Sequence, residues 1–346
     1  MSEGPRQKVA VIGAGSWGTA LSISLASEGH TVCLWVRRPE PAEAISRTRH
    51  NPSYLPDAII PDAVNVTADI EDAVTGADFW VFATPSHALR EAAEHLARHV
   101  HPDLIVVSVA KGIENGTLFT STQVLADVLT DLTPGQIGVL YGPSHAEEVA
   151  AGVPTAVVAA SEKPEIAQAI QDLFMTSRLR VYVNSDVIGV EISGSVKNVM
   201  AIAAGISEGV GYGDNAKAAL ITRGIAEIRR LGMAVGANPT TFSGLAGIGD
   251  LVVTCMSKHS RNRYLGEQIG RGKTLDQVLS EMQMVAEGVR TTQSVRELAR
   301  RHGIEMPITE AVYEILFEGK RPVEAVDDLM NRAAKDEEWL PYVVED

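Results

Sequence analysis

The stretch KVAVIGAGSWGTAL (residues 8–21) decides the fold of this chain. It joins a β-branched apolar run to a helical pattern through Gly13, Gly15 and Gly18, which have the spacing G-x-G-x-x-G. Glycines at this spacing permit a tight turn, a close approach of the backbone to a pyrophosphate and close packing of the helix on the strand. The free N–H groups at the start of the helix favour phosphate. Such a turn can also be purely structural, but its place between a strand and a helix predicts a dinucleotide-binding domain.

Apolar runs alternate with helical patterns through the first half of the sequence. HTVCLWV (residues 30–36), DFWVFAT (78–84) and DLIVVSVA (103–110) are almost continuously hydrophobic. Parallel strands that are covered by helices on both faces have this composition. The alternation predicts an α/β fold that begins with a Rossmann domain, a doubly wound parallel sheet. The runs QIGVLYGP, TAVVAAS and RLRVYVN extend the predicted sheet to about Asn184.

The character of the sequence changes near Val187, where long alanine-rich segments begin. VIGVEISGSVKNVMAIAAGI and NAKAALITRGIAEIRRLGMAVG lack the turn residues that separate strands. Their composition predicts helices, so we expect an all-α C-terminal domain. The predicted division assigns residues 1–190 to the Rossmann dinucleotide-binding domain and residues 191–346 to an all-helical substrate and catalytic domain.

The overall composition excludes several classes of protein. The chain has 346 residues, of which 45% are hydrophobic and 21% are charged, and its formal net charge is -14. This balance gives no general attraction to nucleic acid or to an anionic membrane. Cys33 and Cys255 make neither a disulfide framework nor a zinc site, and His87 and His145 lack metal-binding spacing. Because no signal peptide or transmembrane run is evident, we expect a cytoplasmic protein without membrane insertion.

The end of the second predicted strand indicates which dinucleotide binds. An NAD-selective site usually has an acid about 20 residues beyond the first glycine, where it bonds the ribose 2′-hydroxyl. Here that count reaches Cys33, and Arg37 and Arg38 follow before the first acid, Glu40. Two arginines favour a 2′-phosphate, so NADP(H) is the preferred cofactor and NAD(H) is possible. The alternative is that the arginine pair is only a solvated surface turn.

The segment ISGSVKNVMAIAAGI (residues 192–206) reads as a buried helix that carries a single charge, Lys197. Burial lowers the pKa of a lysine, and a second cation nearby lowers it further. Lys111, at the end of the strand predicted over residues 103–110, is a candidate for that cation. A lysine tuned in this way can donate and accept a proton near neutral pH. The alternative is a surface lysine whose aliphatic stem lies on the helix.

Two further segments have the residue types of an anion-binding site. In GLAGIGDLVVTCMSKHSRNRYLG (residues 244–266), Asp250 and Thr254 share a face if the segment is helical. Ser260, Arg261 and Asn262 precede the next helical run, where a serine cap, an arginine and a helix N-terminus can hold phosphate. Gly142 and Ser144 lie in a loop after a strand and can also bind an anion. The alternatives are an ordinary helix cap and a structural turn.

Several motifs together resemble a known family. GAGSWGTAL, YGPSHAEEV, SVKNVMAIAAGI, FSGLAGIGDLVVTC and HSRNRYLG occur in this order. They are similar to the NAD(P)-dependent sn-glycerol-3-phosphate dehydrogenases of bacterial type, and the resemblance runs from about residue 8 to about residue 335. It implies reversible hydride transfer between NAD(P)H and dihydroxyacetone phosphate, a supply of sn-glycerol 3-phosphate for phospholipid synthesis, and a homodimer.

The resemblance also implies roles for individual residues. Lys197 matches the proton donor and acceptor, Asn198, Asp250 and Thr254 match the lining of the reacting centre, and Lys111 matches a contact to both substrate and cofactor. These five residues form the expected catalytic set, and Lys197 and Asp250 also belong to the expected substrate site. Further substrate contacts are matched by Gly142, Ser144, Ser260, Arg261 and Asn262. Cofactor contacts are matched by Gly13, Gly15, Ser16, Trp17, Gly18, Arg37, Arg38, Tyr54, Lys111, Ala146, Arg261, Val285 and Glu287.

Two other functions remain open at this point. A related Rossmann-fold dehydrogenase for a 3-hydroxy acid or a sugar acid could use the same pair of Lys197 and Asn198. Only a phosphate-bearing substrate would require Arg261. A protein that senses NADP(H) without turnover is the second alternative, although the set of Lys197, Asn198 and Asp250 argues against it.

Overall fold

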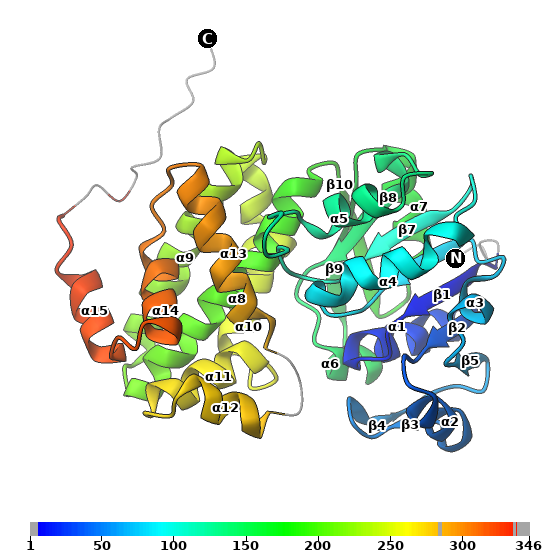
Figure 1. Ribbon diagram of the computed structural model, residues 1–346, viewed down its shortest axis with the longest axis horizontal. Coiled ribbons are helices and arrows are strands. Elements are labelled where there is room, and N and C mark those ends of the chain that lie inside the picture. Colours follow the sequence, from blue (N-terminus) through cyan, green and yellow to red (C-terminus); the bar gives the residue numbers. More distant parts are fainter. Residues whose placement is uncertain (1–5, 283–285, 335–336, 338–346) are drawn as a thin grey trace, which may run out of the picture.

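The computed structural model describes residues 6–282, 286–334 and 337. An α/β half is followed by a helical half, and the two lie side by side (Figure 1). All described strands precede α8 (Val187–Val210), which opens the helical half. The α/β fold class and the helical character of the second half are therefore confirmed. The predicted division between residues 190 and 191 lies near the N-terminal end of α8 and stays a prediction.

The central sheet has the strand order β10-β9-β8-β7-β6-β1-β2-β5. In that order the strands are β10 (Leu179–Asn184), β9 (Thr155–Ser161), β8 (Ile137–Tyr141), β7 (Ile105–Ser108), β6 (Phe79–Phe82), β1 (Lys8–Ile12), β2 (Thr31–Trp35) and β5 (Val64–Thr67). The strands from β8 to β5 are mutually parallel. Because β1 lies inside this sheet, the glycine turn that follows it opens at the carboxyl edge, where open α/β sheets bind ligands.

The edge formed by β9 and β10 differs from the parallel sheet that the sequence predicted. β9 is antiparallel to β8, and β10 runs parallel to β9. The connection from β8 to β9 contains only the short helix α6 (Ala146–Ala150). A parallel pair needs a crossover that returns to the opposite edge of the sheet. Here the chain re-enters the sheet at the edge where β8 ends, so its direction is reversed.

Helices cover both faces of the sheet, which explains the continuous hydrophobicity of its strands. Val9 and Val11 join one apolar cluster, whereas Ala10 and Ile12 join another on the opposite face. The covering helices and helical turns are α1 (Ser16–Ser27), α2 (Pro39–Thr48), α3 (Ile70–Val74), η1 (Ser86–Ala88), α4 (Leu89–Leu96), η2 (Ala97–His99), α5 (Ser121–Val128), η3 (Pro134–Gln136) and α7 (Pro164–Phe174). A small hairpin of β3 (His50–Asn51) and β4 (Leu55–Ile59), which the sequence did not indicate, follows α2.

The helical half is built around α8. The elements that follow it are α9 (Asp214–Ala234), η4 (Pro239–Ser243), the π-helical turn η5 (Leu245–Gly249), α10 (Asp250–Met256), α11 (Arg261–Gly270), α12 (Leu275–Glu281), α13 (Glu287–Arg301), α14 (Pro307–Phe317) and α15 (Pro322–Met330). α8 and α11 approach closely, because a Cβ on Gly205 would lie 2.0 Å from the carbonyl oxygen of Arg263. This contact places the start of α11 beside the helix that carries Lys197.

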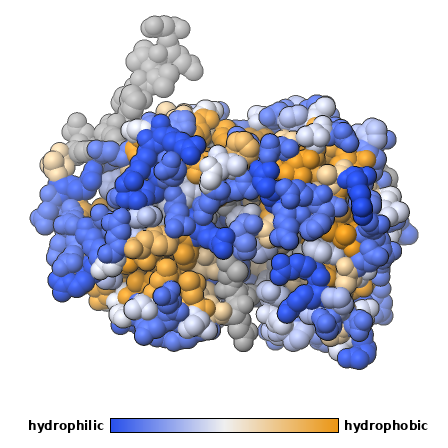
Figure 2. Space-filling model, in the orientation of Figure 1, coloured by the Kyte–Doolittle hydropathy of each residue, from blue (hydrophilic) through white to orange (hydrophobic). Residues whose placement is uncertain are grey.

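α8 is also long and apolar enough to cross a membrane by length and composition. However, 89% of its most apolar window is buried inside the protein, as expected of a core helix. α8 therefore forms the hydrophobic centre of the helical half. On the face shown in Figure 2, by contrast, hydrophilic residues cover most of the surface and hydrophobic residues gather in a few patches.

Candidate active site

The turn after β1 has the geometry that its glycines predict. Gly13 has φ +113°, and a Cβ at this position would lie 2.9 Å from the carbonyl oxygen of Ala83. A Cβ on Gly18 would lie 2.0 Å from the carbonyl oxygen of Gly13. Gly15 precedes α1, and no atom lies within 4 Å of the Cβ position there. The turn is therefore closed on the side of the sheet and open on the side of solvent.

The start of α1 fits a dinucleotide phosphate. No side chain caps the start of α1. A helix N-terminus presents backbone N–H groups and the positive end of the helix dipole, which favour phosphate. Ser16 donates a hydrogen bond to the carbonyl oxygen of Tyr54 at 2.6 Å, which joins α1 to the β3–β4 hairpin. Trp17 is half-buried against the apolar clusters beneath. Four predicted cofactor residues (Gly15, Ser16, Trp17 and Tyr54) are thus gathered at one place.

The arginines beyond β2 lie on the same edge of the sheet. Arg37 and Arg38 are exposed, and Arg38 directly precedes α2. Burial and the cations Arg290 and Arg37 lower the pKa of His87, so these arginines lie near the loop after β6. Arg290 was not predicted. The signal for it is its position three residues after Glu287, on the same face of α13.

Glu287 connects the helical half to the sheet edge. Its carboxylate accepts a hydrogen bond from the backbone N–H of Ser86 at 2.8 Å. This contact places the start of α13 against the loop that follows β6. Val285, the other cofactor residue predicted in this segment, lies outside the described residues. The cofactor residues that can be placed therefore come from both halves of the chain.

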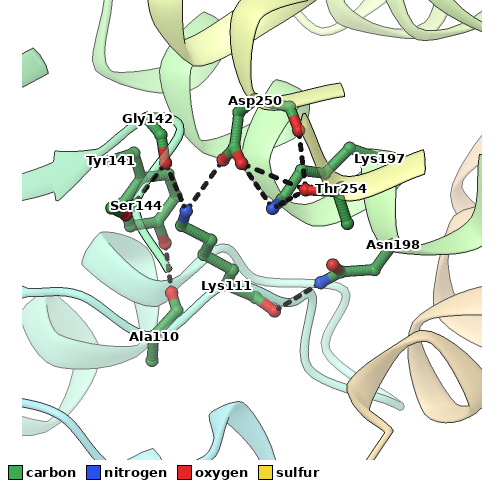
Figure 3. Close-up of polar contacts among 9 residues, drawn as sticks. All are labelled: Ala110, Lys111, Tyr141, Gly142, Ser144, Lys197, Asn198, Asp250 and Thr254. Carbon is green, nitrogen blue, oxygen red and sulfur yellow. Dashed lines mark hydrogen bonds and ion pairs between the residues drawn. The ribbon is translucent and has the colours of Figure 1, made fainter. Parts of the chain in front are cut away.

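Lys111, Lys197 and Asp250 form a buried charged cluster where the two halves meet (Figure 3). Lys197 Nζ donates to Asp250 Oδ1 at 2.6 Å. Lys111 Nζ donates to Asp250 Oδ2 at 2.7 Å. The side chain of Asp250 is 1% exposed, and those of Lys111 and Lys197 are 14% and 8% exposed. One carboxylate thus holds a lysine from the sheet edge and a lysine from α8.

The charges of this cluster shift the pKa values of Asp250 and Lys197. Burial opposes ionisation of Asp250, but Lys111 and Lys197 outweigh it and hold the pKa of Asp250 below its ordinary value. Burial lowers the pKa of Lys197 to about 8, Asp250 opposes this shift and Lys111 adds to it. A lysine with such a pKa exchanges a proton near neutral pH.

Thr254 and Asn198 complete the surroundings of the two lysines. Thr254 Oγ1 accepts from Lys197 Nζ at 2.7 Å and donates to the carbonyl oxygen of Asp250 at 2.6 Å, as expected of residues one helical turn apart. Asn198 Nδ2 donates to the carbonyl oxygen of Lys111 at 3.4 Å. All five residues predicted to be catalytic therefore lie in one cluster.

The loop after β8 contributes backbone oxygen and a hydroxyl to the cluster. Lys111 Nζ donates to the carbonyl oxygen of Gly142 at 3.0 Å, and Ser144 Oγ donates to the same oxygen, also at 3.0 Å. Gly142 has φ +141°, which L side chains rarely adopt. Ala146 is buried at the start of α6. The structure therefore brings Gly142 and Ser144 to Lys111.

The predicted anion clamp lies at the start of α11. Ser260 caps this helix, because its Oγ accepts from the backbone N–H of Arg263 at 3.2 Å. Arg261 is exposed in the first turn. Asn262 is buried, and its Oδ1 accepts from the backbone N–H of Gly288 at 3.0 Å, which leaves its amide N–H groups as donors. An exposed guanidinium and a helix N-terminus with amide donors suit a phosphate.

The described residues contain no group of three or more His, Cys, Asp or Glu side chains that could hold a metal ion.

Tyr141 was not predicted from the sequence, although it lies within the cluster drawn in Figure 3. Its only signal is its place as the last residue of a buried strand directly before the Gly142 loop.

Comparisons with known proteins agree with this arrangement. The family model described as "NAD-dependent glycerol-3-phosphate dehydrogenase N-terminus" matches residues 8–167, and that described as the C-terminus matches residues 186–327. A glycerol-3-phosphate dehydrogenase [NAD(P)+] of Salinibacter ruber is 63% identical over 337 residues, which cover 97% of this chain and 99% of that protein. Another from Chlorobium phaeobacteroides is 56% identical, with 95% and 99% of the two chains covered.

A solved structure extends the similarity to the fold. The crystal structure of glycerol-3-phosphate dehydrogenase from Coxiella burnetii has a TM-score of 0.90 and 38% sequence identity to this chain. The match covers 94% of this chain and 99% of that one. With both family models and nearly full-length relatives in agreement, the chain belongs to the NAD-dependent glycerol-3-phosphate dehydrogenase family.

Proposed function

We propose that this enzyme interconverts dihydroxyacetone phosphate and sn-glycerol 3-phosphate with NAD(P)H as the hydride carrier. The observation that carries this proposal is the shared ion pair of Lys111 and Lys197 with Asp250 at the carboxyl edge of a dinucleotide-binding sheet. Family membership supplies the substrate class. The glycine turn and the uncapped start of α1 fit the cofactor.

Lys197 acts as the proton donor and acceptor. Within the described part of the chain, Lys197 Nζ directs two of its three N–H bonds to Asp250 and Thr254. The third N–H bond can therefore be donated to a substrate oxygen. NAD(P)H, when bound, supplies the hydride. Protonated Lys197 donates to the carbonyl oxygen of the substrate during reduction and takes the hydroxyl proton in the reverse direction. Its positive charge also stabilises negative charge that develops on that oxygen.

The remaining polar groups bind and orient the substrate. Arg261 and Asn262 hold the phosphate at the start of α11, and Ser260 fixes this start by capping the helix. A phosphate held away from the reacting carbon limits its motion, so that binding energy serves orientation. Lys111 and Asp250 lie next to Lys197 and contact the polar end of the substrate.

The preferred cofactor is NADP(H). Arg37 and Arg38 are exposed beyond β2, where the ribose of a dinucleotide lies in this fold. Two guanidinium groups favour the additional phosphate of NADP(H), and NAD(H) remains a second cofactor. Kinetics with NADH and with NADPH, each at saturating dihydroxyacetone phosphate, test this preference. A larger kcat/KM with NADH would contradict it.

The decisive experiment mixes the protein, NADPH and dihydroxyacetone phosphate and follows absorbance at 340 nm. A fall that depends on both enzyme and substrate supports the proposed reaction. A stable signal with NADPH still bound would instead identify a protein that binds the cofactor without turnover. Replacing dihydroxyacetone phosphate by unphosphorylated dihydroxyacetone is the matched control, because only the phosphate requires Arg261.

The cellular context follows from the same proposal. The enzyme works as a cytoplasmic homodimer without membrane insertion or nucleic acid, and its product supplies phospholipid synthesis. Its Rossmann domain, residues 1–190, binds the cofactor, and residues 191–346 bind substrate and perform the proton transfer. Both cysteines are buried and unpaired, which suits a reducing compartment. Sedimentation of the purified protein tests the dimer.

A further inference from the structure

Tyr141 lies fully buried between the sheet and α8. It is the last residue of β8 and is 0% exposed. Its ring packs on Gly194 of α8, where an added Cβ would lie 2.5 Å from Cδ2 of the tyrosine. Only a glycine at position 194 leaves room for this ring. The position of the tyrosine is therefore fixed by packing from the helix that also carries Lys197.

The hydroxyl of Tyr141 binds the backbone directly before Lys111. It donates to the carbonyl oxygen of Ala110, which also accepts from Ser121 Oγ at 2.8 Å. Ser121 lies between Thr120 and Thr122, whose side chains both donate to the buried carboxylate of Glu191 on α8. Burial raises the pKa of Tyr141 well above its usual value, so the phenol keeps its proton and remains a donor.

The side chain of Lys111 lies across the same tyrosine. Its Nζ is 5.6 Å from the centroid of the Tyr141 ring, within the range of a cation–π contact. The same Nζ donates to the carbonyl oxygen of Gly142, the residue after Tyr141. Figure 3 shows Lys111 between Ala110 at one end and Gly142 and Asp250 at the other. Tyr141 thus contacts Lys111 at both ends: its hydroxyl binds the backbone directly before Lys111, and its ring faces the ammonium group of Lys111.

We propose that Tyr141 is a positioning residue, whose hydroxyl and ring hold Lys111 against one oxygen of Asp250 and leave the other oxygen to Lys197. This inference rests on the proposed function, because it concerns the same reacting centre. Tyr141 acts through Lys111 and does not itself contact the substrate. Its contribution is to keep the two lysines on separate oxygens of one carboxylate.

The consequence of losing this position can be derived from the titratable groups that face Lys197. These are Asp250 and Cys255 on α10, Lys111 from the sheet edge and His145 before α6. If Lys111 moves away, Lys197 loses a neighbouring cation and becomes the only one of the two lysines that is paired with Asp250. Both changes favour the ammonium form, so the pKa of Lys197 rises above about 8. Proton transfer then follows a different pH profile.

The test is Tyr141→Phe, which removes the hydroxyl and keeps the ring on Gly194. We expect kcat for reduction at pH 7 to fall up to about tenfold, the effect of one lost hydrogen bond, while the Kd for NADPH is unchanged. Reduction needs protonated Lys197, so the alkaline limb of the pH profile of kcat for reduction should move to higher pH. Tyr182→Phe is the matched control, because Tyr182 is a half-exposed tyrosine on β10. It should leave both kcat and the pH profile as in the unmodified enzyme.

A double variant separates positioning from general structure. In a Lys111→Met background, Tyr141→Phe should have little further effect on kcat, because the residue through which it acts is gone. A full additional loss, or an unshifted alkaline limb in the single variant, would overturn the proposal.

A second readout does not depend on turnover. An amine-reactive reagent modifies only the neutral form of Lys197, so its rate of modification depends on pH. In Tyr141→Phe the pH profile of this rate should move to higher pH. An unshifted profile would also overturn the positioning role. If the unmodified enzyme does not reduce dihydroxyacetone phosphate, the proposed function fails, and this modification assay still decides the role of Tyr141.

Discussion

The carboxyl groups of Asp250 and Glu191 are equally buried but have different partners. Each residue is 1% exposed; Glu191 is part of α8, and Asp250 is the first residue of α10, which packs against α8. Asp250 accepts from the ammonium groups of Lys111 and Lys197. Glu191 accepts from neutral donors, the hydroxyls of Thr120 and Thr122 and the backbone N–H of Thr122.

The two carboxyl groups respond in opposite directions. Burial raises the pKa of Glu191, and its neutral hydrogen bonds only reduce this effect. The lysines lower the pKa of Asp250 in spite of the same burial. Hydrogen bonds from neutral donors therefore do not offset the effect of burial on the pKa here, whereas the two cations do. Asp250 thus belongs to a cluster with two cations that is suited to proton transfer, whereas Glu191 joins α5 to α8 through uncharged donors.

The largest effect is expected from Lys197→Ala, which removes a cation from the charged cluster. Loss of the proton donor should lower kcat by about a thousandfold or more, while the Kd for NADPH stays nearly unchanged. Steady-state kinetics and NADPH fluorescence titration measure the two quantities. Lys217→Ala is the matched control, because Lys217 pairs with Glu208 away from the cluster. Rates like those of the unmodified enzyme would remove the proton-transfer role.

Asp250→Asn tests whether the carboxylate charge is needed. The two lysines would then lack a buried counter-charge, so we expect the free energy of unfolding to fall by about 3 kcal/mol. We also expect kcat to fall by about a hundredfold, because Lys197 loses its orientation. Urea denaturation and initial rates measure these effects. Asp276→Asn, on the surface helix α12, is the control, and a similar small change in both variants would contradict the argument.

Arg261→Ala extends the comparison to an exposed charge. Its loss should raise the KM for dihydroxyacetone phosphate by about ten- to a hundredfold, because charge-assisted hydrogen bonds to the phosphate disappear. We expect a smaller change in kcat. Arg271→Ala, after the other end of α11, is the matched control. An unchanged KM would exclude the phosphate clamp.

Arg37→Asp should change the choice of cofactor. A negative charge near the 2′-phosphate should lower kcat/KM for NADPH relative to NADH by about tenfold. The ratio of the two kcat/KM values measures this effect, and Arg47→Asp in α2 is the control. An unaltered ratio would mean that Arg37 does not contact this phosphate.

The smallest effect is expected from Glu191→Gln, the neutral counterpart of Asp250→Asn. Because the folded pKa of Glu191 is raised, folding binds a proton between the ordinary and the raised pKa. The stability from this group is therefore present below its ordinary pKa and is lost as pH rises through the raised value. The variant should lack this pH dependence, and its free energy of unfolding should change by about 1 kcal/mol, which urea denaturation at several pH values measures. A loss of stability as large as that in Asp250→Asn would break the comparison.

The sequence predicted those parts of the fold that depend on hydrophobic pattern and on glycine spacing. The strands around β1 and the helix α8 are examples, because burial on all sides leaves a continuous apolar run. The reversed direction of β9 was not predicted, since an apolar run has the same composition in either direction. The β3–β4 hairpin was missed because its strands are short and largely exposed.

The candidate site was predictable where residues are local in sequence. The pair of Asp250 and Thr254 follows from one helical turn, and its hydrogen bond is present. The contact between Lys111 and Asp250 spans 139 positions, and no local pattern encodes it. Tyr141 was missed for a related reason. A tyrosine in a buried strand is an ordinary core residue until the backbone that its hydroxyl meets is known.

The shared carboxylate of Asp250 also limits how the two halves can be recombined. A Rossmann half carries Lys111, and a helical half carries Lys197 and Asp250. Joining this Rossmann half to a helical half that lacks an acid at the position of Asp250 would leave the ammonium group of Lys111 without its carboxylate partner. The halves are therefore not interchangeable modules, and substitutions in one are constrained by a single side chain of the other.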